Sequence, residues 1–157
     1  MLADLIQKTG LTLKPEYDTS YRQEVRHNDQ LIAVIQSTGS NVMMIDIQTG
    51  PARDLYLIAV NEMHAARQLQ SLVKLNNSTS VPISSITTWA DRENSHQQIE
   101  LLSIDVQENT AFYISKGNHV ELLESSIQHF ADRFTPMHPA ADLLINAEVV
   151  SKQSLSA

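Results

Sequence analysis

The sequence predicts an α+β fold in which helices flank an antiparallel sheet, in the order α-βββ(β)-α-βββ-α, followed by a C-terminal tail. Residues 97–106 and 111–115 are two runs of alternating apolar side chains around a polar turn, the pattern of a β-hairpin. Apolar side chains then recur at three- and four-residue steps, which indicates an amphipathic helix. They are Val120, Leu123, Ile127, Phe130, Ala131 and Phe134. A hairpin followed directly by a helix is therefore the predicted centre of the fold.

The chain before this centre predicts a short helix and then a meander of strands. Residues 2–9 place apolar side chains on one side and end at Gly10, a residue typical of helix C-terminal caps. Residues 12–18 contain Pro15 and lack a period, so we expect a connector there. Three strands follow, because runs rich in β-branched residues alternate with turn residues. The strands span residues 22–27, 31–35 and 42–47, with turns at 28–29 and 37–41.

A second helix is predicted in the middle of the chain. Residues 53–60 follow the breaker Gly50-Pro51 and read as a fourth strand. Asn61 is placed to cap the helix after it, because its side-chain oxygen can accept from free N–H groups of the first turn. The predicted sheet-facing side consists of Ala66, Leu69, Val73 and Asn76, with Leu72 adjacent. Residues 83–90, after a polar loop that Pro82 ends, predict another strand.

We expect one domain over residues 1–134, because neither half has enough predicted strands to close a core alone. Residues 135–157 are expected to be a C-terminal extension that starts at Pro136. It would hold a short helix at residues 140–150 and then a mobile tail of small polar residues.

Composition limits the possible functions. The 157 residues include 42% hydrophobic and 18% charged residues, as in ordinary globular domains. A formal net charge of −7 repels phosphate backbones and anionic headgroups, so we expect no nucleic acid partner and no membrane insertion. The absence of cysteine excludes disulfides, thiolate metal sites and cysteine nucleophiles. No basic signal-peptide region precedes the first apolar residues, and no apolar run is long enough to cross a bilayer, so a cytoplasmic protein is expected.

No residue pattern predicts catalysis. Gly-x-Ser-x-Gly elbows and glycine-rich phosphate loops are absent from the sequence. On the predicted helix, His119 and His129 would stand about 80° apart, too far round to share a metal ion. Glu121 and Glu124 fit a solvated helix face better than an acid–base pair. We therefore predict no catalytic, cofactor-binding or metal-binding residues.

The remaining features suit contact with another protein. The charges Arg22, Glu24 and Arg26 indicate an edge strand, whose unpaired backbone groups can accept an incoming strand. Met43, Met44 and Met63 are flexible apolar groups, which fill core gaps and also suit adaptable binding surfaces.

Three segments carry a resemblance to a known family. They are Thr9-Gly10-Leu11, Leu72-Val73-Lys74-Leu75-Asn76, and Ala111-Phe112-Tyr113-Ile114 running into Leu122-Leu123. With the predicted order of elements and the acidic, cysteine-free composition, the chain resembles the class I type III secretion chaperones over about residues 2–134. These are small bacterial dimers that hold the N-terminal segment of an effector or regulator before export.

The resemblance implies a homodimer that binds an effector segment in extended form and has no catalytic residues. It implies partner-binding grooves near Leu5, Ile6, Val34 and Ile45. The implied dimer interface is built around Leu55, Leu57, Leu69 and Leu72. The mechanism would be holding, by apolar burial and strand addition.

Two other classes of protein stay open. One is a small α+β enzyme such as an acetyltransferase, although residues 60–63 offer an acid where a pyrophosphate would have to dock. The other is a toxin-immunity or inhibitor protein, which is also acidic and without a site.

Overall fold

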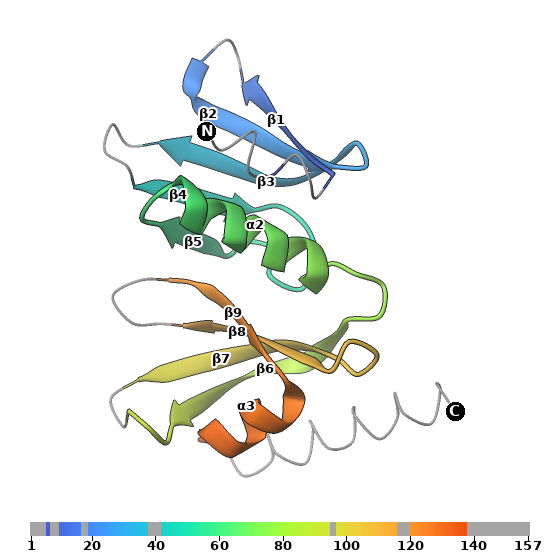
Figure 1. Cartoon of the computed structure of the whole chain (residues 1–157), viewed down its shortest axis with the longest axis vertical. Helices are drawn as coiled ribbons and strands as arrows, with labels where there is room; N and C mark the ends of the chain where they lie inside the picture. The colour runs from blue at the N-terminus through green and yellow to red at the C-terminus, as the bar shows by residue number, and fades with distance from the viewer. Residues whose placement is uncertain are drawn as a thin grey trace. The chain divides into compact units, whose positions relative to one another are not determined.

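The computed structural model describes residue 6 and residues 10–16, 19–37, 42–94, 97–115 and 120–137 (Figure 1). These residues fall into two compact units, each built on one five-stranded antiparallel sheet. Unit 1 comprises the described residues of Met1–Asn76 together with Val120 and Glu121, and unit 2 comprises the others. The predicted α+β class of antiparallel strands and helices is confirmed, but the strands form two sheets where a single sheet was predicted.

The sheet of unit 1 is a meander in which consecutive strands are neighbours, in the order β1-β2-β3-β4-β5. Its strands are β1 (Leu11–Glu16), β2 (Thr19–His27), β3 (Gln30–Ser37), β4 (Met43–Ile47) and β5 (Tyr56–Ala59). Asn28 and Asp29, between β2 and β3, both have positive φ, 51° and 64°, as a tight two-residue hairpin turn requires. The turn predicted at residues 28–29 and the strands on either side of it are confirmed.

Helix α2 (Glu62–Leu75) lies across the face of this sheet beside β4 and β5 (Figure 1). Asn61 is its N-cap, as predicted, and the Asn61 side-chain oxygen accepts a hydrogen bond from the backbone N–H of His64 at 2.7 Å. The Asn61 cap therefore sets the start of the helix at Glu62.

The buried side of α2 seals the core of unit 1. Its buried residues are Ala65, Ala66, Gln68, Leu69, Leu72 and Leu75. Of the predicted sheet-facing residues, Ala66 and Leu69 are buried, and Val73 and Asn76 are partly buried. Leu72, predicted to lie beside them, is fully buried. Leu57 and Ala59 of β5 are also fully buried, so α2 and β5 pack on each other.

Unit 2 has a sheet in the order β10-β6-β7-β8-β9. Its elements are β6 (Val81–Asp91), β7 (Gln98–Asp105), β8 (Thr110–Ser115), β9 (Leu122–Ser125), α3 (Ile127–Arg133) and β10 (Phe134–Pro136). The hairpin predicted from the alternating runs is present as β7 and β8, with the turn between Asp105 and Thr110.

Four aromatic rings form the core of unit 2 beneath α3. Trp89 and Phe130 meet edge to face at 5.0 Å between ring centroids, and Phe130 lies 4.9 Å from Phe134. Tyr113 contacts both phenylalanines, at 5.4 Å and 5.0 Å. Such pairs add about 0.5–1.5 kcal/mol each beyond their area burial, so these ring contacts help to hold α3 on the sheet.

The long helix predicted over residues 120–134 is wrong. Leu122 is buried and pairs with Ile114, so this part of the chain is strand β9. The helix begins only after Ser126, whose side chain accepts from His129 N at 3.1 Å and acts as its N-cap. Apolar side chains spaced three apart also fit a short strand joined to a short helix, and pairing with β8 decides between the two.

The connector predicted at residues 12–18 is also wrong, because residues up to Glu16 form β1. Pro15 is compatible with a strand at the edge of the sheet, because the N–H groups of such a strand that face away from its neighbour take no part in the ladder. The predicted edge strand at residues 22–27 is instead β2, between β1 and β3. Its charges pair with each other: Arg26 Nη2 lies 3.0 Å from Glu24 Oε2.

Two strand boundaries differ from the prediction. The fourth strand begins at Tyr56, since residues 51–54 form a turn in which Asp54 has φ 71°. Strand β6 begins before Pro82, which lies inside a strand with a register irregularity and does not end the loop. Bulges accommodate such a proline in a sheet.

Several predictions concern residues outside the described ones. These are the first helix apart from residue 6, the helix at residues 140–150, and the tail. The single domain over residues 1–134, with its extension over 135–157, stays a prediction.

We predict that Gly50→Ala destabilises unit 1 more than Gly10→Ala. Both glycines have positive φ, 84° at Gly50 and 78° at Gly10. Either change to alanine therefore lowers the free energy of unfolding by about 1–2 kcal/mol. A Cβ at Gly50 would clash with Oδ1 of Asn76. It would displace the amide that donates to Thr49 Oγ1, adding about 1 kcal/mol. A Cβ at Gly10 meets nothing closer than 3.8 Å. Urea unfolding of the two variants measures the difference, and equal losses would contradict the role given to Asn76.

Candidate functional site

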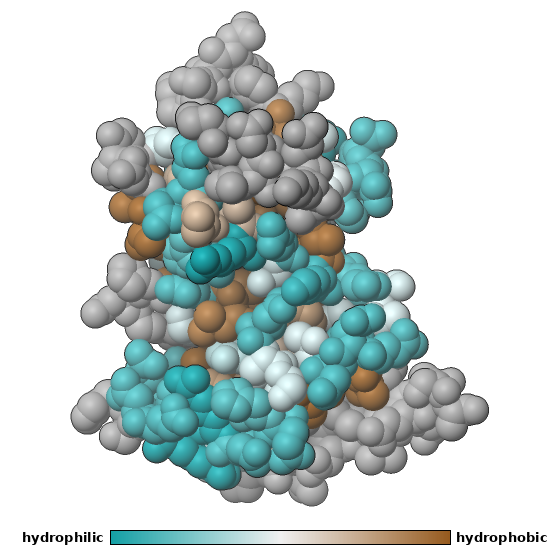
Figure 2. All heavy atoms as spheres, viewed as in Figure 1, coloured by the Kyte–Doolittle hydropathy of each residue, from teal (hydrophilic) through white to brown (hydrophobic). Residues whose placement is uncertain are grey.

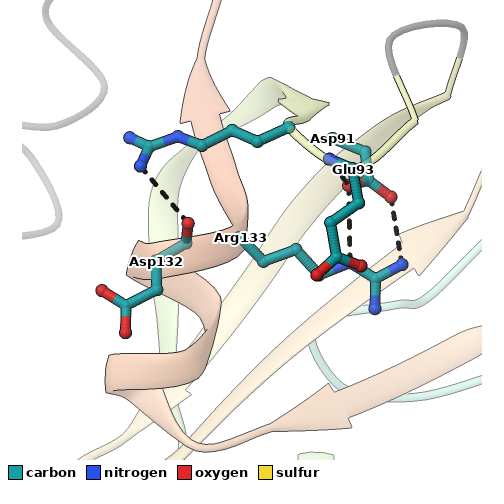
Figure 3. Close-up of polar contacts among 5 residues, drawn as sticks. Asp91, Glu93, Asp132 and Arg133 are labelled. Carbon is teal, nitrogen blue, oxygen red and sulfur yellow. Dashed lines mark hydrogen bonds and ion pairs between the residues drawn. The ribbon is translucent and has the colours of Figure 1, made fainter.

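A partly buried ion pair lies in unit 2, between the end of β6 and the end of α3 (Figure 3). Arg133 Nη2 donates to Asp91 Oδ2 at 3.0 Å, and Arg133 Nε lies 3.4 Å from Asp91 Oδ1. Glu93 adds a longer contact to Arg133 Nε at 3.6 Å. The Asp91 side chain is only 2% exposed, whereas that of Arg133 is 34% exposed.

The protonation state of this pair argues for a structural role. Burial alone would raise the pKa of Asp91, but Arg133 and the backbone N–H groups of Glu93 and Asn94 together hold that pKa below its ordinary value. The bond to Asp91 raises the pKa of Arg133. A carboxylate that stays ionised and fully engaged is a poor proton donor or acceptor for catalysis.

Arg92 fastens the same junction from the other side. Its Nε donates to Thr135 Oγ1 at 2.6 Å, and its Nη1 donates to the carbonyl of Asp132 at 3.3 Å. The backbone N–H of Arg92 donates to the carbonyl of Arg133 at 2.9 Å. Together with Asp91, these contacts clamp α3 and β10 onto β6.

Tyr113 is a second buried titratable group of unit 2. Burial raises the pKa of its phenol, and the charge of Arg133 and a hydrogen bond with Ser125 offset this only in part. The hydroxyl therefore stays neutral within the aromatic core.

A second polar cluster lies at the β6–β7 end of unit 2. Thr79 Oγ1 donates to Asp105 Oδ2 at 2.6 Å, and the backbone N–H of Glu108 donates to Asp105 Oδ1 at 3.1 Å. Ser80 and Ser103 share a hydrogen bond through their hydroxyls. Among the residues with described side chains, no histidine or lysine bonds either serine, so neither has the base that an activated nucleophile needs.

No group of three or more potential ligands that could hold a metal ion occurs within the described residues. Over the same part of the chain, neither helix combines the length and apolar character required to span a bilayer. The remaining candidate is a surface of unit 1.

That surface lies along the outer side of β5. Ile58 pairs with Met44 across β4, but its backbone N–H donates to the carbonyl of Val120 at 2.9 Å, on the side away from β4. Backbone direction alternates along a strand, so the N–H and C=O groups of Tyr56 also point away from β4. Strand β5 therefore has backbone groups that face away from β4, and one of them, the N–H of Ile58, bonds Val120.

Exposed apolar side chains lie on this edge and on the helix turn that follows it. Tyr56 is 50% exposed, Val60 is 42% exposed and Met63 is 55% exposed. They are three of the five large hydrophobic side chains exposed among the described residues. Figure 2 shows hydrophobic atoms reaching the surface around the mostly hydrophilic outer face of α2. We call Tyr56, Ile58, Val60 and Met63 the β5 edge surface.

His64 fixes one end of the β5 edge surface. Its Nδ1 accepts a hydrogen bond from the backbone N–H of Val60 at 3.1 Å, so the proton of the neutral ring is on Nε2. Nε2 lies 3.5 Å from Oε2 of Glu121. His64 thus contacts both Val60, the residue after β5, and Glu121, the residue after Val120.

The residues predicted to bind a partner or to form a dimer lie mostly in the core. Ile6 and Ile45 are 0% exposed and Val34 is 6% exposed, whereas Leu5 is outside the described residues. The four residues predicted for the dimer interface comprise Leu57, Leu69 and Leu72, which are fully buried, and Leu55, which is partly buried. Both predictions stay predictions, but in the structure these side chains pack inside unit 1.

Sequence reasoning did not find the β5 edge surface. Asn61 was recognised as a cap, yet nothing local indicated that His64, three residues later, would contact Glu121, which is 57 positions further on. Met63 was the one member singled out as a possible partner contact.

Comparison of the chain with protein-family models, with curated proteins and with solved structures gives no match.

We predict that Asp91→Asn lowers the free energy of unfolding at pH 7 by about 1.5–3 kcal/mol, the usual worth of a hydrogen bond to a charged group. Because the folded-state pKa of Asp91 is lowered, this stabilisation is present above the ordinary aspartate pKa and is lost as pH falls through the folded-state pKa. The gap between wild type and variant should therefore shrink below about pH 4.

Denaturant unfolding across pH checks this. Asp132→Asn is the matched control, because the Asp132 carboxylate is exposed and accepts a hydrogen bond from Gln128 Nε2 at 2.9 Å. Its effect should stay within about 0.5 kcal/mol. A gap for Asp91→Asn that is the same at pH 7 and at low pH would contradict the assignment.

Proposed function

We propose that this protein is a non-catalytic protein-binding module that holds an extended segment of another polypeptide by strand addition to β5. The observation that supports the proposal most is the hydrogen bond from Ile58 N to the carbonyl of Val120. It demonstrates that this edge takes a backbone partner other than β4. Strand addition obtains affinity from main-chain hydrogen bonds and specificity from alternate side chains.

The β5 edge surface offers both main-chain hydrogen-bonding groups and side chains for contact. A segment laid along it can bond the outward backbone groups of Tyr56 and Ile58 and cover the side chains of Tyr56, Val60 and Met63. Apolar burial and backbone hydrogen bonds then favour binding, against the loss of freedom on association.

The resemblance to the class I type III secretion chaperones makes an effector or regulator segment the proposed cargo. In that case the protein acts in the bacterial cytoplasm as a homodimer and keeps its cargo extended for export. The net charge of −7 supports a protein partner over nucleic acid. The engagement of Asp91, Arg133 and Asp105 in structural contacts supports holding over catalysis.

Selection of displayed peptides on the purified full chain tests strand addition. Peptides with alternating apolar residues should be enriched. Ile58→Pro should weaken the binding of the synthesised peptides at least about tenfold, because it removes the outward N–H. An N–H that does not face β4 can be lost without breaking the sheet. Ile58→Ala, which keeps the N–H, should weaken binding less.

Circular dichroism of both variants checks that they fold. Two outcomes would reject strand addition at β5: no enrichment of any peptide, or equal binding by wild type and Ile58→Pro.

We predict a homodimer in solution. Multi-angle light scattering should give twice the monomer mass at micromolar concentration. If the interface uses the partly buried Leu55, Leu55→Glu should shift the mass toward the monomer, because it places a charge in an apolar contact. Arg53→Gln, on the adjacent exposed turn, also lowers the net charge by one and is the control for the change in charge. A wild-type chain that stays monomeric at all concentrations would contradict the dimer.

A further inference from the structure

The β5 edge surface is occupied, in part, by the chain itself. Val120 and Glu121 lie between β8 and β9 in sequence. They belong to unit 1, whereas β8 and β9 belong to unit 2. The carbonyl of Val120 accepts from Ile58 N at 2.9 Å. This is the same N–H that an added strand would need.

A side-chain contact holds these two residues in place. Glu121 Oε2 lies 3.5 Å from His64 Nε2, and the two side chains are only 30% and 16% exposed. His64 is itself fixed at both ends, because its backbone N–H donates to Asn61 and its Nδ1 accepts from Val60. A rigid imidazole therefore presents its Nε2–H to the carboxylate, next to the backbone bond.

We propose that Val120 and Glu121 act as an internal competitor for the β5 edge, held there by His64, so that a partner segment binds only when they leave. The inference rests on the proposed function, since it concerns access to the same edge. A partner then binds in proportion to the fraction of molecules with the edge open, and its apparent dissociation constant exceeds the intrinsic one by the inverse of that fraction. Release of Glu121 and binding of a partner promote each other.

The geometry favours an internal competitor over a permanent sixth strand. Ile58 of β5 donates its backbone N–H to the carbonyl of Val120, and β9, which pairs with β8, starts only two residues later, at Leu122. The backbone bond to Ile58 and the partly exposed pair of Glu121 with His64 are contacts of a kind that can open locally.

The test uses Glu121→Ala in the full chain, with Glu124→Ala as the matched control. Glu124 is an exposed glutamate three positions along, in β9, and its replacement makes the same change in charge. The first readout is hydrogen exchange of the Ile58 amide, which needs no ligand. Exchange should be about three- to tenfold faster in Glu121→Ala, the factor expected for the loss of one partly exposed charged contact. It should be unchanged in Glu124→Ala.

The second readout is the affinity of a peptide selected by display on the wild-type chain. Glu121→Ala should bind this peptide more tightly by the same factor, and Glu124→Ala should bind it as wild type does. Unchanged exchange at Ile58 would overturn the inference, because Glu121 would then not hold the edge closed.

Faster exchange with unchanged affinity would also overturn it, while Ile58→Pro would still report on strand addition separately. If no peptide binds wild type or Glu121→Ala although exchange accelerates, the proposed function fails, and the inference fails with it.

Discussion

Backbone hydrogen bonding at the edge of a sheet is the constraint on which unit 1 depends. Each edge strand of an antiparallel sheet leaves every second N–H and C=O without a ladder partner, and those groups must find another partner or face water. In β5 one such group, the N–H of Ile58, is satisfied by the carbonyl of Val120. The proposed function and its regulation both follow from which backbone occupies that position.

Helix α2 determines which side of β5 is available. Leu57 and Ala59 are fully buried and pack beneath the helix, so the two-residue period of a strand directs Tyr56 and Ile58 to the opposite face. The N-terminus of the same helix adds His64, fixed through Asn61 and Val60. One local element therefore closes the core, exposes the apolar edge and provides the group that holds Glu121.

Unit 2 uses its charged and aromatic residues differently. Asp91, which would be a candidate catalytic acid by burial alone, is fixed by Arg133, and the ring of Phe134 lies 5.4 Å from the guanidinium of the same arginine. Breaking such a pair leaves a charge without its partner, which is strongly destabilising. The pair thus stabilises the junction of β6 with α3.

The sequence by itself determined the features that a few neighbouring residues specify. The β7–β8 hairpin, the turn at Asn28 and Asp29 and the capping of α2 by Asn61 all follow from local periodicity, turn propensity and cap chemistry. Only the tertiary structure decided that β2 is an interior strand, that residues 122–125 form β9, and that His64 meets Glu121. The physical reason is that sheet edges, and the segments that cover them, are set by pairing between residues far apart in the chain. A sequence window records what each segment can form, but not which backbone lies beside it.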